Sequence, residues 1–514
     1  MTRFAVIAPA FTSHARALEA LSDELVARGH RVDWVQQADA RALLRSRRIS
    51  FRAVGARSHP PGSLAAVVAR AARPGGPRGL RRVIDDVAAA TDMLCAEAPA
   101  VLRALGTEAV IADQMEAAGG LVAEHLGLPC VSVACALPVN REPRLPLPVM
   151  PWGFGGTERG LRINEGSTRV YDWMMRPHAR VIAARAAAFG LAPRERLDQC
   201  LSPLLQLSQT VEAFDFPREA PPPHFHAVGP LRPPEAAEPD LAPWVPGLRP
   251  DRPFVFASLG TLQGGRAGLF GRIARACRAR GAQLLLAHCG ALDARQAEAL
   301  RRQGATWVTD FAPQRAAVAR ADVVVTHAGL NTVMDALAAA RPMLLLPIAF
   351  DQPGAAARAA HAGAGLVCLP AFAGAGRIAQ ALGRLLDEPR FAAAAAALAP
   401  AVRSAGGTAR AADLVEDALR RAAGTAASAQ EQEQDAASGR GDGGDRGAAD
   451  AGGRDSVVAV REMAAAARPI PRAAARPSGP PPAAVPRTGP AASGASAQPA
   501  DAPYPAMATR GPHA

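Results

Sequence analysis

Short apolar runs alternate along this chain with longer segments in which apolar residues recur every three or four positions. Residues 4–10 form the first run, and in the segment after it Leu18, Leu21 and Leu25 fall on one face of a helix that ends at Gly29. Continuous apolar strands that alternate with helices are typical of a parallel sheet covered on both faces. The pattern therefore predicts an α/β protein.

This pattern occurs twice, on either side of a proline-rich stretch. The runs expected to be strands are residues 4–10, 31–37, 109–114 and 130–139 in the first set, and 254–260, 283–290, 305–311, 322–329, 342–350 and 364–370 in the second. Residues 230–253 hold too many prolines for a regular element. We expect two Rossmann-like, doubly wound domains, residues 1–230 and 254–424, joined by a linker at 231–253 and facing each other across a ligand-binding cleft.

The two ends of the chain differ from these domains. Residues 425–514 contain no Leu, Phe or Trp, so they bury too little apolar area to offset the entropy of ordering, and we expect a disordered tail. The N-terminal apolar segment is too short for a signal peptide and is interrupted by Pro9 and His14. Because no run is long enough to cross a membrane, we expect a soluble protein of the cytoplasm.

The charge and aromatic content of the chain bear on whether it binds nucleic acid. The net charge of +12 and the pI of about 10.7 are values often found in nucleic-acid-binding proteins. All the basic residues are Arg, however, which is typical of a GC-rich genome, and aromatic residues make up only 4%, too few for base-stacking surfaces. We therefore expect no nucleic-acid partner. The seven scattered cysteines form no CxxC pair, which favours buried thiols over disulfides or metal ligands.

Polar residues follow the apolar run at 322–329. The chain passes through a glycine turn into a helix and carries His327, Gly329, Asn331 and Thr332 at this point. Gly329 allows a ligand to approach the backbone closely, and the free N–H groups of a helix start attract an anion such as a diphosphate, without a metal. The alternative is that Asn331 or Thr332 only caps the helix and His327 is an ordinary surface residue.

Side chains suited to a nucleoside lie on either side of this turn. Phe311 closes the preceding strand with a ring that can stack on a base, and Gln314 places an amide beside it. Asp335 lies eight residues after His327, about two helical turns along, where its carboxylate can accept hydrogen bonds from ribose hydroxyls.

Two further strand ends complete the set. Ser258, Gly260 and Thr261 again combine a glycine with hydroxyl groups, and Asp351 with Gln352 can hold the hydroxyls of a sugar. Base, ribose, diphosphate and sugar each find a suitable group at the carboxyl ends of the second sheet. The sequence therefore predicts a nucleotide-sugar site there.

The first domain offers a candidate base. A strand leads through Pro9 to His14 at a helix start, and Asp113 ends another strand. Transfer of a sugar to an alcohol requires removal of the hydroxyl proton, which suits imidazole near neutral pH, and a carboxylate supports the protonated ring. An isolated histidine is more often structural, and no group of His, Cys and carboxylates has metal-ligand spacing. The histidines expected to be ordinary surface or packing residues are His59, His125 and His178.

From Phe311 to Gln352 the ordered series resembles the donor-binding motif of the UDP-glycosyltransferases, inverting enzymes of the GT-B fold. The resemblance implies that these residues hold a UDP-sugar, that His14 is the catalytic base and that Asp113 is its partner. Two positions depart from the family pattern. Phe311 stands where plant members usually have Trp, and Asp335 replaces the more usual Glu.

A closer resemblance covers residues 1–421. Segments at 4–32, 113–143, 225–231, 256–264 and 350–354 are similar to the zeaxanthin glucosyltransferases of bacterial carotenoid pathways. This implies transfer of glucose from UDP-glucose to the ring hydroxyls of zeaxanthin, giving the mono- and then the diglucoside, with no further cofactor. Another apolar alcohol, such as a macrolide, flavonoid or sterol, is the alternative acceptor. A nucleotide-sugar epimerase would leave the His and Asp pair unexplained.

Three stretches are candidates for contact with an apolar acceptor and its membrane. Residues 145–154 and 171–176 offer aromatic and apolar surface, although Trp173 and Met174 can equally be core residues. A carotenoid diol resides in the bilayer, so we expect peripheral contact with the inner face of the bacterial cytoplasmic membrane. The arginine-rich residues 73–82 can meet anionic headgroups there, or form a solvated loop.

Overall fold

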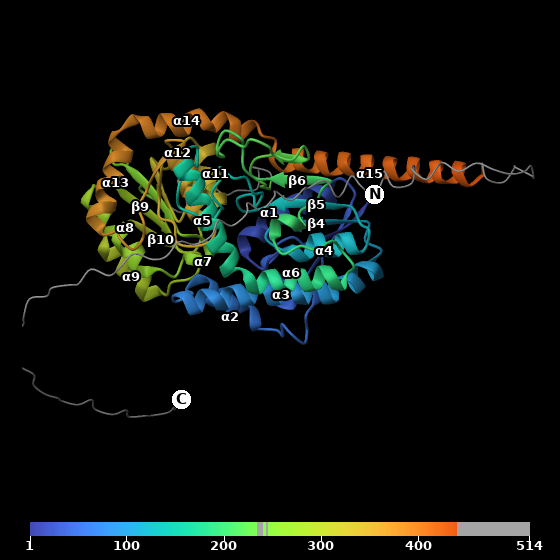
Figure 1. Ribbon diagram of the computed structural model, residues 1–514. Coiled ribbons are helices and arrows are strands. Elements are labelled where there is room, and N and C mark those ends of the chain that lie inside the picture. Colours follow the sequence, from blue (N-terminus) through green and yellow to red (C-terminus); the bar gives the residue numbers. More distant parts are fainter. Residues whose placement is uncertain (234–239, 243–244, 439–514) are drawn as a thin grey trace, which may run out of the picture. The chain divides into compact units, whose positions relative to one another are not determined.

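The computed structural model describes residues 1–233, 240–242 and 245–438. They form two parallel sheets, each with helices on both faces (Figure 1). The first sheet has the strand order β3-β2-β1-β4-β5-β6-β7, and every neighbouring pair is parallel. Its strands are β1 (Arg3–Ile7), β2 (Arg31–Gln37), β3 (Ser50–Val54), β4 (Ala109–Asp113), β5 (Cys130–Ala134), β6 (Leu205–Ser208) and β7 (Phe225–Ala227).

Two apolar cores cover the faces of this sheet. One packs α1 against it and the other packs α3, α4 and α6. In α1 the side chains of Leu18, Leu21 and Leu25 are fully buried, which confirms the predicted helical face. The helices of this half are α1 (Thr12–Ala27), η1 (Ala38–Leu43), α2 (Ser63–Ala72), α3 (Pro77–Leu105), α4 (Ala117–His125), α5 (Glu158–Met174), α6 (Arg176–Ala188) and η2 (Leu197–Cys200).

The second sheet has the order β10-β9-β8-β11-β12-β13 and is also parallel. Its strands are β8 (Phe254–Ser258), β9 (Gln283–Ala287), β10 (Trp307–Thr309), β11 (Val323–Thr326), β12 (Met343–Leu345) and β13 (Gly365–Val367). Its helices are α7 (Gly260–Gln263), α8 (Ala267–Ala279), α9 (Ala294–Gln303), α10 (Gln314–Arg320), α11 (Leu330–Ala338), α12 (Gln352–His361), α13 (Ala375–Asp387) and α14 (Pro389–Ser404). The two-sheet α/β architecture is as predicted.

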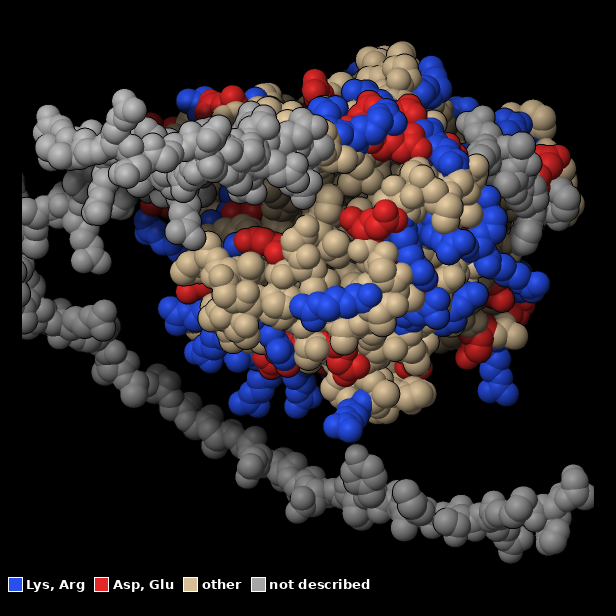
Figure 2. All heavy atoms as spheres, turned by 90° about the vertical axis from the view of Figure 1, so that its right-hand side faces the viewer, with Lys and Arg blue, Asp and Glu red and all other residues tan. Residues whose placement is uncertain are grey.

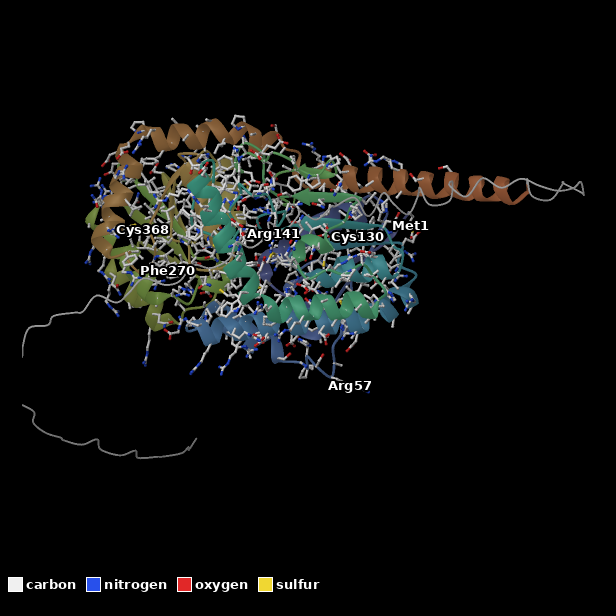
Figure 3. The ribbon with its side chains drawn as sticks, in the orientation of Figure 1. Met1, Arg57, Cys130, Arg141, Phe270 and Cys368 are labelled. Carbon is white, nitrogen blue, oxygen red and sulfur yellow. The ribbon has the colours of Figure 1, made fainter. Side chains whose placement is uncertain are left out.

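Side chains fill the space around both sheets (Figure 3). All seven cysteines are free, and only Cys289 is not buried, as expected for thiols used in packing. On the face drawn in Figure 2, basic and acidic side chains are interspersed. None of the helices that the structure describes is long and apolar enough to span a membrane.

The C-terminal helix α15 (Gly407–Ser438) corrects the predicted boundaries. Its buried Ala411, Val415 and Ala418 belong to the core of the first half, against α1, so the second domain does not continue to residue 424. The helix also includes residues 425–438, so the prediction of disorder from 425 is wrong for this part. Ala, Gln and Glu in this stretch are strong helix formers, so the helix continues beyond the residues that pack. The rest of the predicted tail, 439–514, lies outside the described residues.

The predicted linker is partly packed. Leu241 and Val245 are buried in the core of the second half, although no regular element is formed in the described part of residues 231–253. Residues 234–239 and 243–244 lie outside the described residues.

Packing of α15 on α1 gives a stability prediction. Val415→Asp places an unpaired carboxylate in a fully buried position, so we expect the free energy of unfolding to fall by roughly 3–5 kcal/mol. Urea unfolding of the full chain measures this. Ala409→Asp adds the same charge at an exposed position in the first turn of α15 and should leave the unfolding midpoint unchanged. Equal midpoints for both variants would show that α15 does not dock stably.

Candidate active site

His14 and Asp113 come together at the carboxyl edge of the first sheet. His14 lies in the first turn of α1, just after β1, and Asp113 is the last residue of β4, the neighbour of β1. Nδ1 of His14 and Oδ2 of Asp113 are 2.7 Å apart, and Oδ1 accepts from the backbone N–H of Met115 at 2.8 Å. Because an ionised carboxylate can only accept, Nδ1 carries the proton and Nε2 keeps the lone pair that a base needs.

Burial and charge act in opposite directions on His14. Burial is the largest single influence and lowers the pKa of the ring. The charge of Asp113, the hydrogen bond to it and the charge of Asp351 together raise the pKa by more, so it lies above its ordinary value. Asp351 precedes α12 in the second half. Carboxylates from both halves of the protein therefore act on one imidazole.

Two glycine turns enclose His327 at the carboxyl edge of the second sheet. A Cβ atom on Gly260 would lie 2.7 Å from Cε1 of this ring, and one on Gly329 would lie 2.5 Å from Nε2. A side chain at either position would therefore displace the ring. Burial lowers the pKa of His327 to about 4, so the ring is neutral near neutral pH.

The start of α11 is not capped by a side chain. Gly329 is the N-cap residue, and Asn331 and Thr332 lie inside the helix. The capping role considered for these two residues is therefore wrong. The first N–H groups of the helix have no side-chain cap, as an anion-binding helix start requires.

The other predicted donor residues differ in exposure. Phe311 is 52% exposed, so its ring is free to stack, and Thr261 is exposed as well. Ser258 is buried and its Oγ accepts from the N–H of Gly260 at 3.3 Å. Gln352 is buried, and its Oε1 accepts from two backbone N–H groups of the loop after β12, both at 2.9 Å. Ser258 and Gln352 therefore shape loops.

Asp335 is a buried carboxylate with partners on both oxygens. Oδ1 accepts from Nε of Arg232 at 3.1 Å, and Oδ2 accepts from Nε2 of Gln314 at 2.7 Å. The structure thus brings the predicted base-binding and ribose-binding side chains into direct contact. Arg232 belongs to the segment between the two sheets.

The two halves meet at the predicted donor residues. The Asn331 side chain donates to the backbone oxygen of Ser13, next to the dyad, at 3.4 Å. Its Oδ1 accepts from Nε2 of Gln209 in the first half at 2.9 Å. Asp351 accepts from the N–H of Leu137 at 3.2 Å. The residue before His14 therefore contacts the first turn of α11.

Two known enzymes are similar to this chain over most of its length. A zeaxanthin glucosyltransferase of Pantoea ananas is 49% identical over 419 residues, which cover 82% of this chain and 96% of that protein. One of Pseudescherichia vulneris is 45% identical over 422 residues, covering 82% and 98%. The chain belongs to the zeaxanthin glucosyltransferase family.

Two further comparisons agree with this membership. Residues 272–423 match the glycosyltransferase family 28 C-terminal domain. The crystal structure of the glycotransferase of kitacinnamycin aligns with a TM-score of 0.63 at 21% identity, covering 81% of this chain and 99% of that one. At this identity the likeness shows the fold, which is GT-B as expected. The protein is thus a glycosyltransferase of the hexosyltransferase class.

Three side chains of this glycosyltransferase site were missed in the sequence. Arg232 donates to Asp335 and to the backbone oxygen of Asn331, the latter at 2.9 Å. Gln209 follows the short strand β6, and Cys135 follows β5. Arg232 and Gln209 stand in no motif, because each reaches the predicted donor residues only where the two halves meet. Cys135 lies beside the dyad within the first half. The apolar run at 130–139 predicted a strand that includes Cys135, but nothing in it indicated contact with the dyad.

Cys135 lies beside the dyad. One potential ligand atom each from His14, Asp113 and Cys135 lies within 4.8 Å of the others, a spacing that a metal could use. Burial raises the pKa of Cys135 well above its ordinary value, so its sulfur stays protonated and is a poor ligand. Nδ1 of His14 is already committed to Asp113. The cluster therefore fits a hydrogen-bonded base better than a metal centre.

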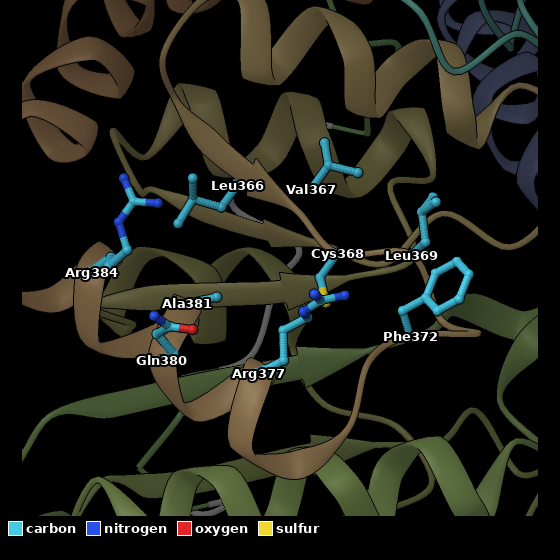
Figure 4. Close-up of a pocket in the computed structure, with 9 residues that line it drawn as sticks. All are labelled: Leu366, Val367, Cys368, Leu369, Phe372, Arg377, Gln380, Ala381 and Arg384. Carbon is cyan, nitrogen blue, oxygen red and sulfur yellow. The ribbon is translucent and has the colours of Figure 1, made fainter.

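A surface hollow lies apart from the dyad. About 340 Å³ in volume, it is bounded by β13, the loop after it and α13, and none of its lining residues is among the predicted site residues. Figure 4 shows Leu369 and Phe372 at one end of it and Arg384 at the other. The hollow therefore lies apart from the predicted site residues of both halves.

Replacing Arg232 tests the contact between the halves. Arg232→Met leaves the buried Asp335 carboxylate with Gln314 as its side-chain partner, and we expect the free energy of unfolding to fall by about 3 kcal/mol. Adding Asp335→Asn should recover part of the loss. A double-mutant cycle in urea measures this coupling. Purely additive effects would show that the ion pair contributes nothing.

Proposed function

We propose that this glycosyltransferase transfers glucose from UDP-glucose to the ring hydroxyls of zeaxanthin, forming the monoglucoside and then the diglucoside with inversion at the anomeric carbon. The hydrogen-bonded His14–Asp113 pair facing the start of α11 is the observation that carries the proposal. The names of the two similar enzymes supply the acceptor and the sugar.

The reaction needs a base on one side of the sugar and a site for the leaving diphosphate on the other. Nε2 of His14 takes the proton from the acceptor hydroxyl as its oxygen bonds to the anomeric carbon. The bond from that carbon to UDP breaks, and the electron pair leaves with the diphosphate. Asp113 stabilises the imidazolium that forms. The proton passes to water after product release.

The leaving group is stabilised by protein dipoles. The uncapped N–H groups at the start of α11 supply hydrogen-bond donors without a metal. Phe311 stacks on the uracil, and Asp335 with Gln314 holds ribose and base. Arg232 must then share Asp335 with the ribose hydroxyls, because it already occupies Oδ1. Asp351 binds sugar hydroxyls beside His14.

The acceptor implies a place in the cell. A carotenoid diol dissolves in the bilayer, so the enzyme works on the cytoplasmic face of the membrane. Residues 73–82, between the end of α2 and the first turns of α3, remain a candidate contact with anionic headgroups.

Mass analysis of pigment tests the proposal. Purified protein with UDP-glucose and zeaxanthin should add one and then two hexose units. His14→Ala should abolish transfer while UDP still binds, because the dyad and the donor loops come from different sheets. Transfer to a macrolide, flavonoid or sterol but not to zeaxanthin would defeat the acceptor assignment. An unchanged rate in His14→Ala would defeat the catalytic one.

The pH dependence tests the dyad itself. Only neutral imidazole accepts a proton, so kcat should rise with pH through the raised pKa of His14. Asp113→Asn removes the charge that raises this pKa, so the rise of kcat with pH should occur at lower pH. The maximal kcat should also fall by roughly 10²–10⁴-fold. Rate measurements across pH on the wild type and the variant check both. If kcat rises over the same pH range in both proteins, His14 is not the titrating group.

A further inference from the structure

The helix α5 carries three large apolar side chains on its outer face, while its Leu161, Tyr171 and Met174 are half-buried. Ile163, Val170 and Trp173 are 42%, 57% and 62% exposed. In this helix, which the structure describes in full, the one buried residue is Asn164. Surface helices of globular proteins normally turn their apolar side chains toward the core. In α5 the arrangement is reversed, and Trp173 is not the core residue considered from the sequence.

Polar contacts hold the inner face of α5 in place. Nδ2 of Asn164 donates to the carbonyl oxygen of Pro143 at 3.2 Å. The carboxylate of Asp172 accepts two hydrogen bonds from Arg141, at 2.7 and 2.9 Å. These contacts attach the helix without using Ile163, Val170 or Trp173. The outer face is therefore available to a partner.

Arginines flank the exposed apolar side chains. Arg159 lies four residues before Ile163 and Arg169 lies four before Trp173, so both share the outer half of the α5 surface. Arg176 is exposed at the start of the next helix, α6. Arg169 also pairs with Glu165. Among the residues that the structure describes, Arg159 and Arg176 form no ion pair with a carboxylate. Arg162 likewise pairs with Glu158. The exposed charges of α5 are therefore three arginines against two glutamates, and Arg159 is the arginine left without an acidic partner beside the apolar side chains.

We propose that α5 docks on an anionic phospholipid bilayer, with Ile163, Val170 and Trp173 in the interface and the flanking arginines at the lipid phosphates. Tryptophan is favoured at the boundary between headgroups and acyl chains, and the long arginine stems let the charge remain at the surface. A helix with these two features on one face binds such membranes from the side. The inference rests on the proposed function only for the reason to dock, namely an acceptor dissolved in the bilayer.

Docking of α5 would bring the sugar end of the predicted donor site toward the membrane. The stretch before α5 contacts the sugar end of the predicted donor site, because the N–H of Gly354 donates to the carbonyl oxygen of Pro148 at 3.1 Å. Trp152, which follows Pro148, is 37% exposed. A continuous piece of chain therefore connects the proposed membrane face with the loop that carries Asp351.

Flotation with vesicles and no substrate tests the inference. The full chain should float with vesicles of phosphatidylcholine and phosphatidylglycerol, and less with phosphatidylcholine alone or at high salt. Ile163→Ser with Val170→Ser, both outside the stretches considered for acceptor contact, should weaken binding by roughly tenfold for each apolar side chain removed. Because both residues are exposed, the thermal unfolding midpoint should not change. Phe372→Ser is the matched control, since that ring is 66% exposed in the second half.

A second readout separates docking from catalysis. The double α5 variant should lose glucosylation of zeaxanthin in vesicles yet keep the wild-type rate on zeaxanthin in detergent micelles. Vesicle binding that is equal in the variant and the wild type, or lost equally in Phe372→Ser, would overturn the proposal. So would a dimer that dissociates only in the α5 variant, because the face would then serve a second copy of the chain. Flotation without any glucosyl transfer would instead defeat the proposed function alone.

Discussion

The 2.7 Å hydrogen bond between His14 and Asp113 joins residues that are 99 positions apart in the sequence. It forms because β1 and β4 are neighbours in a parallel sheet, whose strand ends deliver successive loops to one edge. The bond fixes the proton on Nδ1 and keeps Nε2 basic, and the negative charge offsets the penalty that burial places on the protonated ring. Without the charge of Asp113, burial would lower the pKa of the ring, which would then be a weaker base.

The second half of the site is held by the first. Asn331, Asp335 and Asp351 each bond to a residue outside their own sheet in the described structure. Polar groups that bind a charged, hydroxyl-rich donor would be costly to bury without partners, and the protein supplies those partners itself. In the proposed function, donor binding exchanges one set of hydrogen bonds for another. This exchange couples occupancy of the donor site to the contact between the halves.

The reversed helix α5 follows a similar rule. Its inner face is held by hydrogen bonds and an ion pair, so the exposed Ile163, Val170 and Trp173 are not needed to attach it. A surface that exposes Val170 and Trp173 one turn apart has an energetic cost in water unless something covers it. The fold places that surface next to the stretch that reaches the sugar end of the donor site.

The sequence by itself determined the two parallel sheets, because their strands are continuous apolar runs. It also marked the loops proposed to bind the donor, because glycine and polar residues stand there at strand ends. It also determined the pairing partners His14 and Asp113, since each follows a strand. Strands β3, β6 and β7 were missed, because short strands owe their existence to pairing with a neighbour and carry no long apolar run. Only the tertiary structure decided that α15 returns to the first half, that Arg232 and Gln209 reach the donor residues and that Trp173 faces outward. Contacts between distant segments leave no periodicity in the chain, so local pattern cannot show them.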